Sequence, residues 1–219
     1  MDEPPDRDAV RDTYDRIAGH FSKTRAHPWP EIESFCADAL AGTLGLDLGC
    51  GNGRHVPPLS ETVERVLAVD VSRELLFEAD ERLAGAGIDG AALVQADATA
   101  LPLASSVVDV AVYVATLHHL PGRDRRRASL NELARVLAPE GRALVSAWST
   151  AHDRFEADEG FDTTLDWTLP DGEVVDRFYH IYDPAEFETD LAASGLMAVD
   201  TFVSSGNCYA VVAAEGKGK

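Results

Sequence analysis

The stretch LDLGCGNGR, residues 46–54, constrains the fold of this chain more than any other part of the sequence. Its first residues are typical of a buried strand, and its glycines let the backbone turn sharply and let a ligand approach without a Cβ in the way. A dinucleotide-binding turn would carry glycine where this chain has Arg54, and the G-K-[ST] of a phosphate-binding loop does not occur. The stretch therefore predicts an α/β domain with a ligand site at the carboxyl end of a strand.

Strand-like and helix-like patterns alternate on both sides of this turn. Strands are expected at 43–48, 65–70, 91–95, 108–114 and 143–148. Helices are expected at 6–18, 31–40, 54–60, 72–84, 125–137 and 184–194. Two further alternating strands, joined at 204–206, would add an antiparallel edge. This order predicts a Rossmann-like, doubly wound sheet of seven strands, mostly parallel, with a C-terminal antiparallel hairpin.

The length of 219 residues suits one domain, which we expect to span 1–219. Residues 1–40 would form an N-terminal helical cap for substrate and cofactor. Residues 149–178 would form an insertion or lid, because the part up to 175 is acidic and aromatic and is expected to be irregular.

Charge, hydropathy and cysteine use bear on the compartment. The chain has 38 acidic and 19 basic residues, a net charge of -19, with acids along its whole length. A dense acidic surface stays hydrated in concentrated salt, so we expect the cytoplasm of a halophile rather than a docking tail for a basic partner. No apolar run reaches the roughly 18 residues of a membrane span, and the acidic start is unlike a secretory signal. Three separated cysteines argue for a reducing compartment and against a metal site.

Aspartates stand at the ends of successive expected strands. Asp47 lies in the first, and Asp70 ends the second, where it can accept hydrogen bonds from both hydroxyls of a ribose. Asp97, followed by Ala98, comes after the third, where a carboxylate can receive the exocyclic amine of adenine. Each acid alone is more often a turn residue. The three together, after a glycine turn, resemble the class I S-adenosylmethionine-dependent methyltransferases over 46–148.

The resemblance implies S-adenosylmethionine as cofactor and S-adenosylhomocysteine as product. The cofactor-binding residues it implies are Tyr14, Arg25, Asp47, Gly49, Cys50, Gly51, Asp70, Val71, Asp97, Ala98, Ala115 and His119.

Three segments flank this core: YDRIAGHFSKTRAHPWP at 14–30, DRFYHIYD at 176–183 and GNCYAVV at 206–212. They are similar to the tRNA wobble-uridine carboxymethyl methyltransferases, including the methyltransferase domain joined to an AlkB-like hydroxylase. That family carries Y..IA.HFS.TR..PWP, then R-Y-Y-H-V-F and a closing G-N-W. Phe178 replaces the first tyrosine here, and Cys208 with Tyr209 replaces the tryptophan.

The resemblance implies methyl transfer to the carboxylate of 5-carboxymethyluridine in a tRNA anticodon loop. It also implies a small zinc-ribbon activator, which we expect along the strand Ala91–Gln95. A carboxylate is ionised at neutral pH and needs in-line positioning rather than a general base. The basic stretch at 21–30 supplies Arg25, which can grip a carboxylate at two points. The candidate catalytic residues are Arg25, Trp29, His118, Trp148, Tyr179 and His180.

Several of these residues have a second interpretation. Trp29 could stack an unpaired base, as Trp148, Phe178 and Tyr179 could, or fill a gap between two helices. The histidines of LHHL, at 118–119, could act as base or donor, contact the cofactor, or pack. The arginines of 123–127 could meet RNA phosphates or begin a solvated helix. Arg25 could instead hold the cofactor carboxylate, and Cys50 could be a small loop filler.

Two other functions compete. A methyltransferase acting on a quinone or another small metabolite would share the core and would want a base, which LHHL could supply. The TR..PWP and YHIY flanks favour the RNA family. A non-catalytic module would keep the fold alone, and the intact glycine turn with its acids argues against it.

Overall fold

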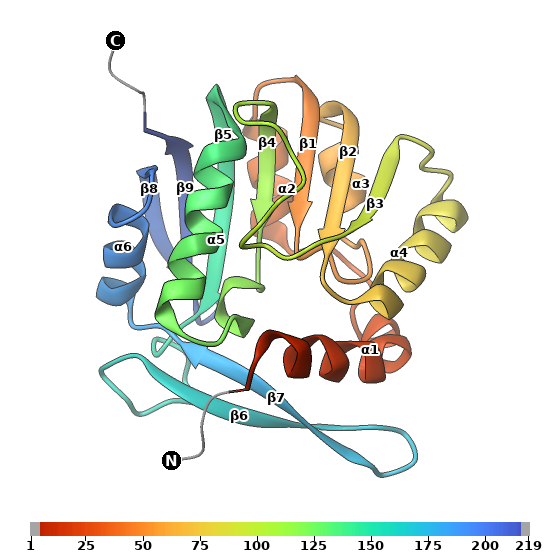
Figure 1. Cartoon of the computed structure of the whole chain (residues 1–219), viewed down its shortest axis with the longest axis vertical. Coiled ribbons are helices and arrows are strands. Elements are labelled where there is room, and N and C mark those ends of the chain that lie inside the picture. Colours follow the sequence, from red (N-terminus) through yellow and green to blue (C-terminus); the bar gives the residue numbers. More distant parts are fainter. Residues whose placement is uncertain (1–4, 216–219) are drawn as a thin grey trace.

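A sheet of seven strands forms the centre of the molecule, in the order β3-β2-β1-β4-β5-β9-β8 (Figure 1). Its strands are β1 (Gly42–Leu48), β2 (Val63–Asp70), β3 (Ala91–Gln95), β4 (Val108–Tyr113), β5 (Leu137–Trp148), β8 (Leu196–Ser204) and β9 (Asn207–Ala214). The first five run parallel, and β9 is antiparallel to both β5 and β8. The predicted doubly wound sheet with a C-terminal antiparallel hairpin is confirmed.

The computed structural model describes residues 5–215. The ends of the predicted domain 1–219, and most of the acidic start that argues against a secretory signal, lie outside the described residues. Among the described helices, none combines the length and the apolar character needed to cross a bilayer.

Helices cover both faces of the sheet (Figure 1). The covering helices are α2 (Pro30–Asp38), α3 (Val56–Ser60), α4 (Arg73–Ala86), α5 (Arg123–Val136) and α6 (Pro184–Ala192), and a further helix, α1 (Arg7–Thr24), and a short 3-10 turn, η1 (Leu117–His119), complete the set within residues 5–215. Neighbouring residues of a strand point to opposite faces. Tyr113 of β4 accordingly packs with Leu130 of α5, whereas Val112 packs with Leu59 of α3. Each face of the sheet therefore has its own apolar core.

Helix α1 lies outside these two layers, at the same end of the sheet as a separate hairpin (Figure 1). The carboxylate of Asp6 caps it by accepting the Ala9 N–H at 2.8 Å. Its buried residues include Tyr14, Ile17 and Ala18, the i, i+3, i+4 spacing of an amphipathic helix. They pack against α4, so the helix is held over one end of the sheet.

The hairpin consists of β6 (Phe161–Thr168) and β7 (Val174–Ile181), paired antiparallel as a second sheet. The expectation that this part of the chain is irregular is therefore wrong. In FDTTLDWT every second residue is half-buried and the others are exposed, so the period of a strand is present. The exposed positions carry aspartate or threonine, and the pairing partner lies beyond a turn at Gly172, which has φ +89. The acidic composition hid the alternation.

Strand β5 also begins earlier than expected. Helix α5 ends at Val136, and the strand starts at Leu137 rather than at residue 143. Leu137 already pairs with Val108 of β4, and the register then shifts before pairing resumes at Arg142. The irregular stretch between these two points is the segment APEG, residues 138–141.

Candidate functional site

A pocket with a volume of about 490 Å³ lies at the carboxyl ends of the parallel strands. Leu48, Asp70 and Ala115, at the ends of β1, β2 and β4, form its floor. Tyr14 of α1 and Tyr179 of the hairpin line the opposite wall. Ligands of open α/β sheets bind at this place, outside the ends of the strands. Helix α1 and the hairpin thus turn an open crevice into a covered site.

The glycine turn after β1 depends on missing side chains at two positions. Gly49 and Gly51 have φ values of +71 and +53, which L residues with a Cβ rarely adopt. A Cβ on Gly49 would also collide with the Thr116 side chain, whose hydroxyl donates to the Gly49 carbonyl at 3.2 Å. The N–H of Gly51 donates to Asp70 Oδ2 at 2.8 Å. The turn is therefore locked against two strand ends, with its backbone facing the pocket.

Asp70 is a buried carboxylate that keeps capacity for a ligand. Its Oδ2 accepts from Gly51 N–H, and its Oδ1 accepts from Ser72 N–H at 2.9 Å. Burial raises the pKa of Asp70, and these backbone hydrogen bonds oppose the increase. Each carboxylate oxygen has a second lone pair, so two hydroxyl donors can still be bound. Two adjacent hydroxyls of a ribose fit this requirement.

Asp97 lines the pocket beside Ala98 and is more fully engaged. Its Oδ1 accepts from the N–H and the hydroxyl of Thr99, both at 2.8 Å, and its Oδ2 accepts from Arg125 at 2.9 Å. Burial works to raise the pKa of Asp97, but the bonds from Thr99 and Arg125 outweigh it, so the pKa lies below its usual value. Asp97 is therefore an ionised acceptor at the adenine end of the expected cofactor.

The histidines of η1 have fixed tautomers. The Trp148 N–H donates to His118 Nδ1 at 2.9 Å, so a neutral His118 carries its proton on Nε2. His119 Nδ1 lies 3.0 Å from the Phe178 carbonyl and must donate to it, which leaves Nε2 to accept from the Tyr14 hydroxyl at 2.9 Å. Burial lowers the pKa of His118 well below its usual value and that of His119 to about 3. Both rings are neutral at physiological pH.

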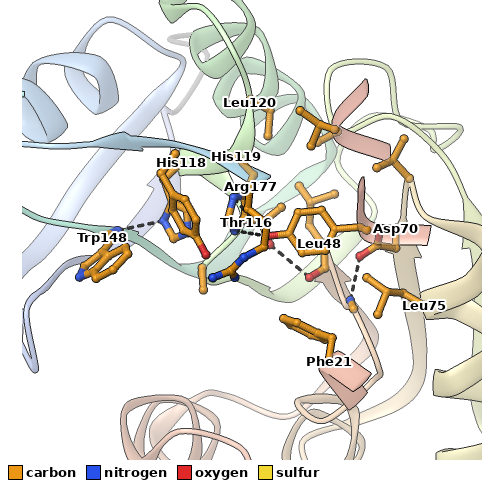
Figure 2. Close-up of a pocket in the computed structure, with 18 of the residues that line it drawn as sticks. Phe21, Leu48, Asp70, Leu75, Thr116, His118, His119, Leu120, Trp148 and Arg177 are labelled. Atoms are coloured by element: carbon orange, nitrogen blue, oxygen red, sulfur yellow. Dashed lines mark hydrogen bonds between the residues drawn. The ribbon is translucent and has the colours of Figure 1, made fainter. Parts of the chain in front are cut away.

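Aromatic rings line the pocket at the end away from Asp70 (Figure 2). Tyr179 stacks on His118 with ring centroids 5.2 Å apart and an interplanar angle of 26°. Trp148 meets Tyr179 edge to face at 5.3 Å. Trp148 is only half-buried, so its indole is available to a flat ligand. This end of the pocket could hold an unpaired base.

The charge of the pocket wall is opposite to that of the chain. The lining residues include three aspartates, Asp70, Asp97 and Asp166, and six arginines, Arg7, Arg25, Arg54, Arg125, Arg154 and Arg177, in a protein of net charge -19. Arg125 and Arg7 face Asp97, at 2.9 and 3.6 Å. The remaining arginines leave an excess of positive charge, which favours an anionic ligand.

A model of the methyltransferase domain matches residues 46–145. The tRNA (carboxymethyluridine(34)-5-O)-methyltransferase alkbh8 of Xenopus tropicalis is 35% identical over 66% of this chain and 22% of its own length. The tRNA (carboxymethyluridine(34)-5-O)-methyltransferase of Schizosaccharomyces pombe is 30% identical over 73% of this chain and 68% of its own length. The chain belongs to this methyltransferase family. It spans only about a fifth of the vertebrate relatives, 20% of the Macaca fascicularis protein for example.

Solved structures agree on the fold of the family. The CcbJ methyltransferase from Streptomyces caelestis superposes with a TM-score of 0.75 at 22% identity, over 92% of this chain and 98% of that one. The DhpI-SAH complex superposes with a TM-score of 0.72 at 22% identity, over 96% of this chain and 97% of that one. At this identity the likeness concerns the fold, which agrees with the sheet order described above.

The structure brings most of the predicted site residues of this family member together in the pocket. The lining includes Tyr14, Arg25, Trp29, Gly49, Gly51, Asp70, Val71, Asp97, Ala98, Ala115, His118, His119, Trp148 and Tyr179. Trp29 also packs against the core under α2 and α3, so the stacking and gap-filling interpretations are compatible.

Two residues of the glycine turn lie behind the pocket wall instead of in it. Asp47 is 1% exposed, its Oδ2 has no hydrogen-bond partner within residues 5–215, and burial raises its pKa to about 8. The Cys50 side chain is buried too, and burial raises the pKa of its thiol well above the usual value. Neither side chain lines the pocket, and Cys50 is a small filler of the turn.

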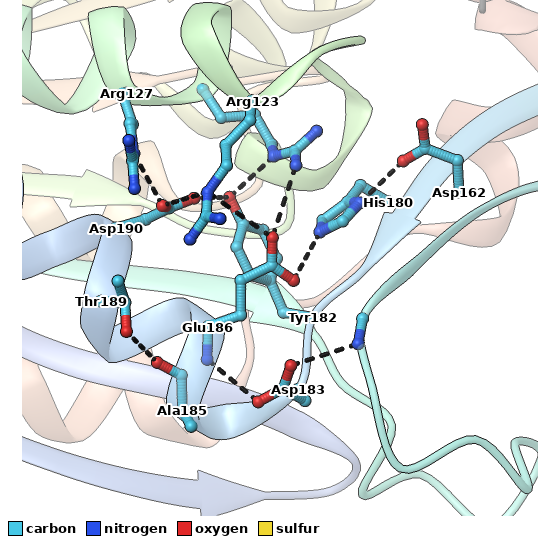
Figure 3. A network of polar contacts seen from close by, with 12 residues as sticks. Arg123, Arg127, Asp162, His180, Tyr182, Asp183, Ala185, Glu186, Thr189 and Asp190 are labelled. Atoms are coloured by element: carbon cyan, nitrogen blue, oxygen red, sulfur yellow. Dashed lines mark hydrogen bonds and ion pairs between the residues drawn. The ribbon is translucent and has the colours of Figure 1, made fainter.

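His180, expected at the substrate, points away from the pocket. In β7 alternate side chains point to opposite faces, so Tyr179 faces the pocket and His180 does not. His180 Nδ1 lies 2.7 Å from Asp162 Oδ1 and Nε2 lies 3.0 Å from Glu186 Oε2 (Figure 3). Because its ring is held between two carboxylates, His180 ties the hairpin to α6. It takes no part in the site.

The arginines at the start of α5 are occupied as well. Arg123 and Arg127 both bind Asp190 Oδ1, at 2.7 and 2.8 Å (Figure 3). Arg126 donates to the Tyr182 hydroxyl at 2.9 Å. The interpretation of these arginines as phosphate contacts is therefore not supported, because their partners are carboxylates and a phenol of the same chain.

Sequence reasoning missed the pocket residues Arg54 and Arg177, and also Asn52, which is buried behind the pocket wall. Asn52 Nδ2 donates to the Arg25 carbonyl at 2.9 Å and so fastens the end of α1 to the glycine turn. Arg177 shares its strand face with Tyr179, two residues away, and the strand period alone would have placed it in the pocket. Arg54 follows the glycine turn directly, and the sequence offered no signal for its direction.

Proposed function

We propose that the protein transfers a methyl group from S-adenosylmethionine to the carboxylate of 5-carboxymethyluridine at the wobble position of a tRNA. The product is a methyl ester. The observation that carries the proposal is the excess of arginine in the pocket of a strongly acidic chain. The names of the curated relatives support this choice of acceptor.

The pocket residues fit the cofactor at one end and the acceptor at the other. Asp70 would hold the ribose of the cofactor and Asp97 would hold its adenine. The glycine turn would let the cofactor approach the backbone without steric conflict. When bound, the cofactor supplies a methyl group on a positively charged sulfur. Trp148 and Tyr179 would stack the wobble base, and Arg25 would orient its carboxylate. The side chains position the reactants and exclude water, which is the assistance that an ionised acceptor needs.

The tautomers of the histidines argue against a small-molecule acceptor that must lose a proton. The lone pair of His118 Nδ1 receives the Trp148 N–H, and that of His119 Nε2 receives the Tyr14 hydroxyl. Neither ring has a free lone pair for a proton, so neither can act as the base that a phenol or amine would want. His118 can only donate, through Nε2–H, and a carboxylate accepts such a bond.

Methylation of tRNA that carries 5-carboxymethyluridine tests the proposal. Nucleoside mass spectrometry should detect the methyl ester, and tRNA with the corresponding amide should not react. Because a carboxyl group with a pKa of about 4 is already ionised, the rate of the chemical step should be flat between about pH 6 and 9. A rate that rises across this range, or methylation of phenols in preference to the carboxylate, would refute the proposal.

We also propose that a small zinc-ribbon activator pairs with β3. This strand, Ala91–Gln95, forms one edge of the sheet and, within residues 5–215, pairs with β2 alone. Its free edge is a template for strand addition. Affinity purification from a native, salt-rich cytoplasm should recover such a partner, and its addition should raise activity. A lone chain with full, partner-independent activity on tRNA would contradict this.

A further inference from the structure

Two guanidinium groups in the pocket wall are buried without a counter-ion. Arg54 is 8% exposed and Arg177 is 9% exposed. Within residues 5–215, neither forms an ion pair with a carboxylate, although two other pocket arginines, Arg7 and Arg125, do. Arg177 Nε is also buried without any hydrogen-bond partner among those residues. Removing a cation from water is costly unless an anion compensates it, so each group requires one.

The two groups lie on different elements of the pocket wall. Arg54 directly follows the glycine turn, with its guanidinium carbon 4.9 Å from the ring centroid of Trp29. Arg177 lies on the hairpin between two aromatic rings, 4.5 Å from Trp167 and 5.2 Å from Tyr179. Figure 2 shows Arg177 between Asp70 at one end of the pocket and Trp148 at the other.

The proposed reaction, on which this inference rests, brings two carboxylates to the same pocket. One belongs to the methionine part of the cofactor and the other to the acceptor. We infer that Arg54 binds the cofactor carboxylate beside the glycine turn, and that Arg177, fixed by Trp167 and Tyr179, binds the acceptor carboxylate. Arg25 lies 5.6 Å from the same Trp167 ring and completes the acceptor site.

Electrostatics support a division between the two sites. Burial, together with the nearby charge of Arg25, lowers the pKa of Arg54 to about 10. Adjacent cations repel each other until an anion binds between them or at each. Asp47 acts against this lowering, but burial raises its own pKa to about 8, so it is a weak counter-ion for Arg54 at neutral pH. The positive charge is therefore left for ligands.

The Arg54 assignment can be tested by binding alone. Isothermal titration would compare S-adenosylhomocysteine with methylthioadenosine, which lacks the amino-acid carboxylate. The wild type should bind the former more tightly. Arg54→Gln should reduce this ratio about tenfold to a hundredfold and leave methylthioadenosine binding nearly unchanged, because only a charge-assisted contact is lost. Arg177→Gln should keep the wild-type ratio. An unchanged ratio in Arg54→Gln, or a lost one in Arg177→Gln, would overturn the assignment.

The Arg177 assignment needs a readout at the acceptor. Competition on the complex with S-adenosylhomocysteine would compare 5-carboxymethyluridine with its amide. Arg177→Gln should lose the preference for the carboxylate at least tenfold, and Arg177→Lys, which keeps the charge, should restore part of it. Thermal unfolding would confirm that both variants are folded, and Arg65→Ala, at an exposed position on β2, is the matched control. A retained preference in Arg177→Gln contradicts this inference alone. If the wild type shows no preference for the carboxylate over the amide, both this inference and the proposed acceptor are contradicted. The binding test of Arg54 does not depend on either outcome.

Discussion

Replacing Asp70 with alanine is expected to abolish S-adenosylmethionine binding while the chain stays folded. Asp70 has a free lone pair on each oxygen at the pocket wall, and its Oδ2 holds Gly51 N–H at 2.8 Å. Two charge-assisted hydrogen bonds to ribose hydroxyls are worth about 1.5–3 kcal/mol each. Their loss, at about 1.4 kcal/mol per factor of ten, weakens affinity roughly a hundredfold to ten-thousandfold. The variant also loses the hydrogen bond that holds Gly51, and the freed glycine turn weakens cofactor affinity further.

Isothermal titration measures the effect of Asp70→Ala, and circular dichroism checks that the variant is folded. Asp80→Ala, at an exposed position on α4, is the control and should bind like the wild type. Asp70→Asn, which keeps the shape and one acceptor oxygen, should fall between the two. Micromolar affinity in Asp70→Ala would show that the ribose is bound elsewhere.

Arg25→Ala is expected to reduce methylation tenfold to a few hundredfold and to change cofactor affinity much less. Its guanidinium lies 5.5 Å from the Phe21 ring and 5.6 Å from the Trp167 ring, at the border of the pocket. In the proposed reaction it grips the acceptor carboxylate, and each charge-assisted bond contributes about 1.5–3 kcal/mol. Steady-state kinetics on 5-carboxymethyluridine tRNA, with titration of the cofactor, measures both quantities.

The controls for Arg25→Ala separate three roles. Arg142→Ala removes an arginine on β5 that donates to backbone carbonyls and does not line the pocket, so it should leave the rate unchanged. If turnover of Arg25→Ala is near normal, Arg25 is a structural residue at the end of α1. If rate and cofactor affinity fall together, Arg25 binds the cofactor carboxylate and shares the role inferred for Arg54.

The floor of the pocket was predictable because it depends on topology alone. The carboxyl ends of parallel strands meet at one edge, so a glycine turn and the acids Asp70 and Asp97 had to come together. Topology alone does not bring Asp47 into the pocket. Asp47 is still part of β1, one residue before the strand ends, and its carboxylate is buried below the glycine turn.

The covering wall was not predictable in the same way, because it depends on tertiary contacts between distant segments. Adjacent residues of a strand face opposite ways, so Tyr179 lines the pocket and the expected site residue His180 does not. Arg177 was missed because the hairpin was not expected. Asp190, which binds both Arg123 and Arg127, lies more than sixty residues further along the chain. Local patterns contain no information on such pairs.

The position of α1 has a consequence for biosynthesis. It is synthesised before α4 and the hairpin, yet its buried face packs on both of them. The Trp167 indole N–H donates to His20 at 3.1 Å, across 147 residues of sequence. A nascent chain therefore carries an uncovered apolar stripe, and its five parallel strands can pair before the site is covered. We expect competence for ligands to arrive late in vectorial folding, only after the hairpin has emerged.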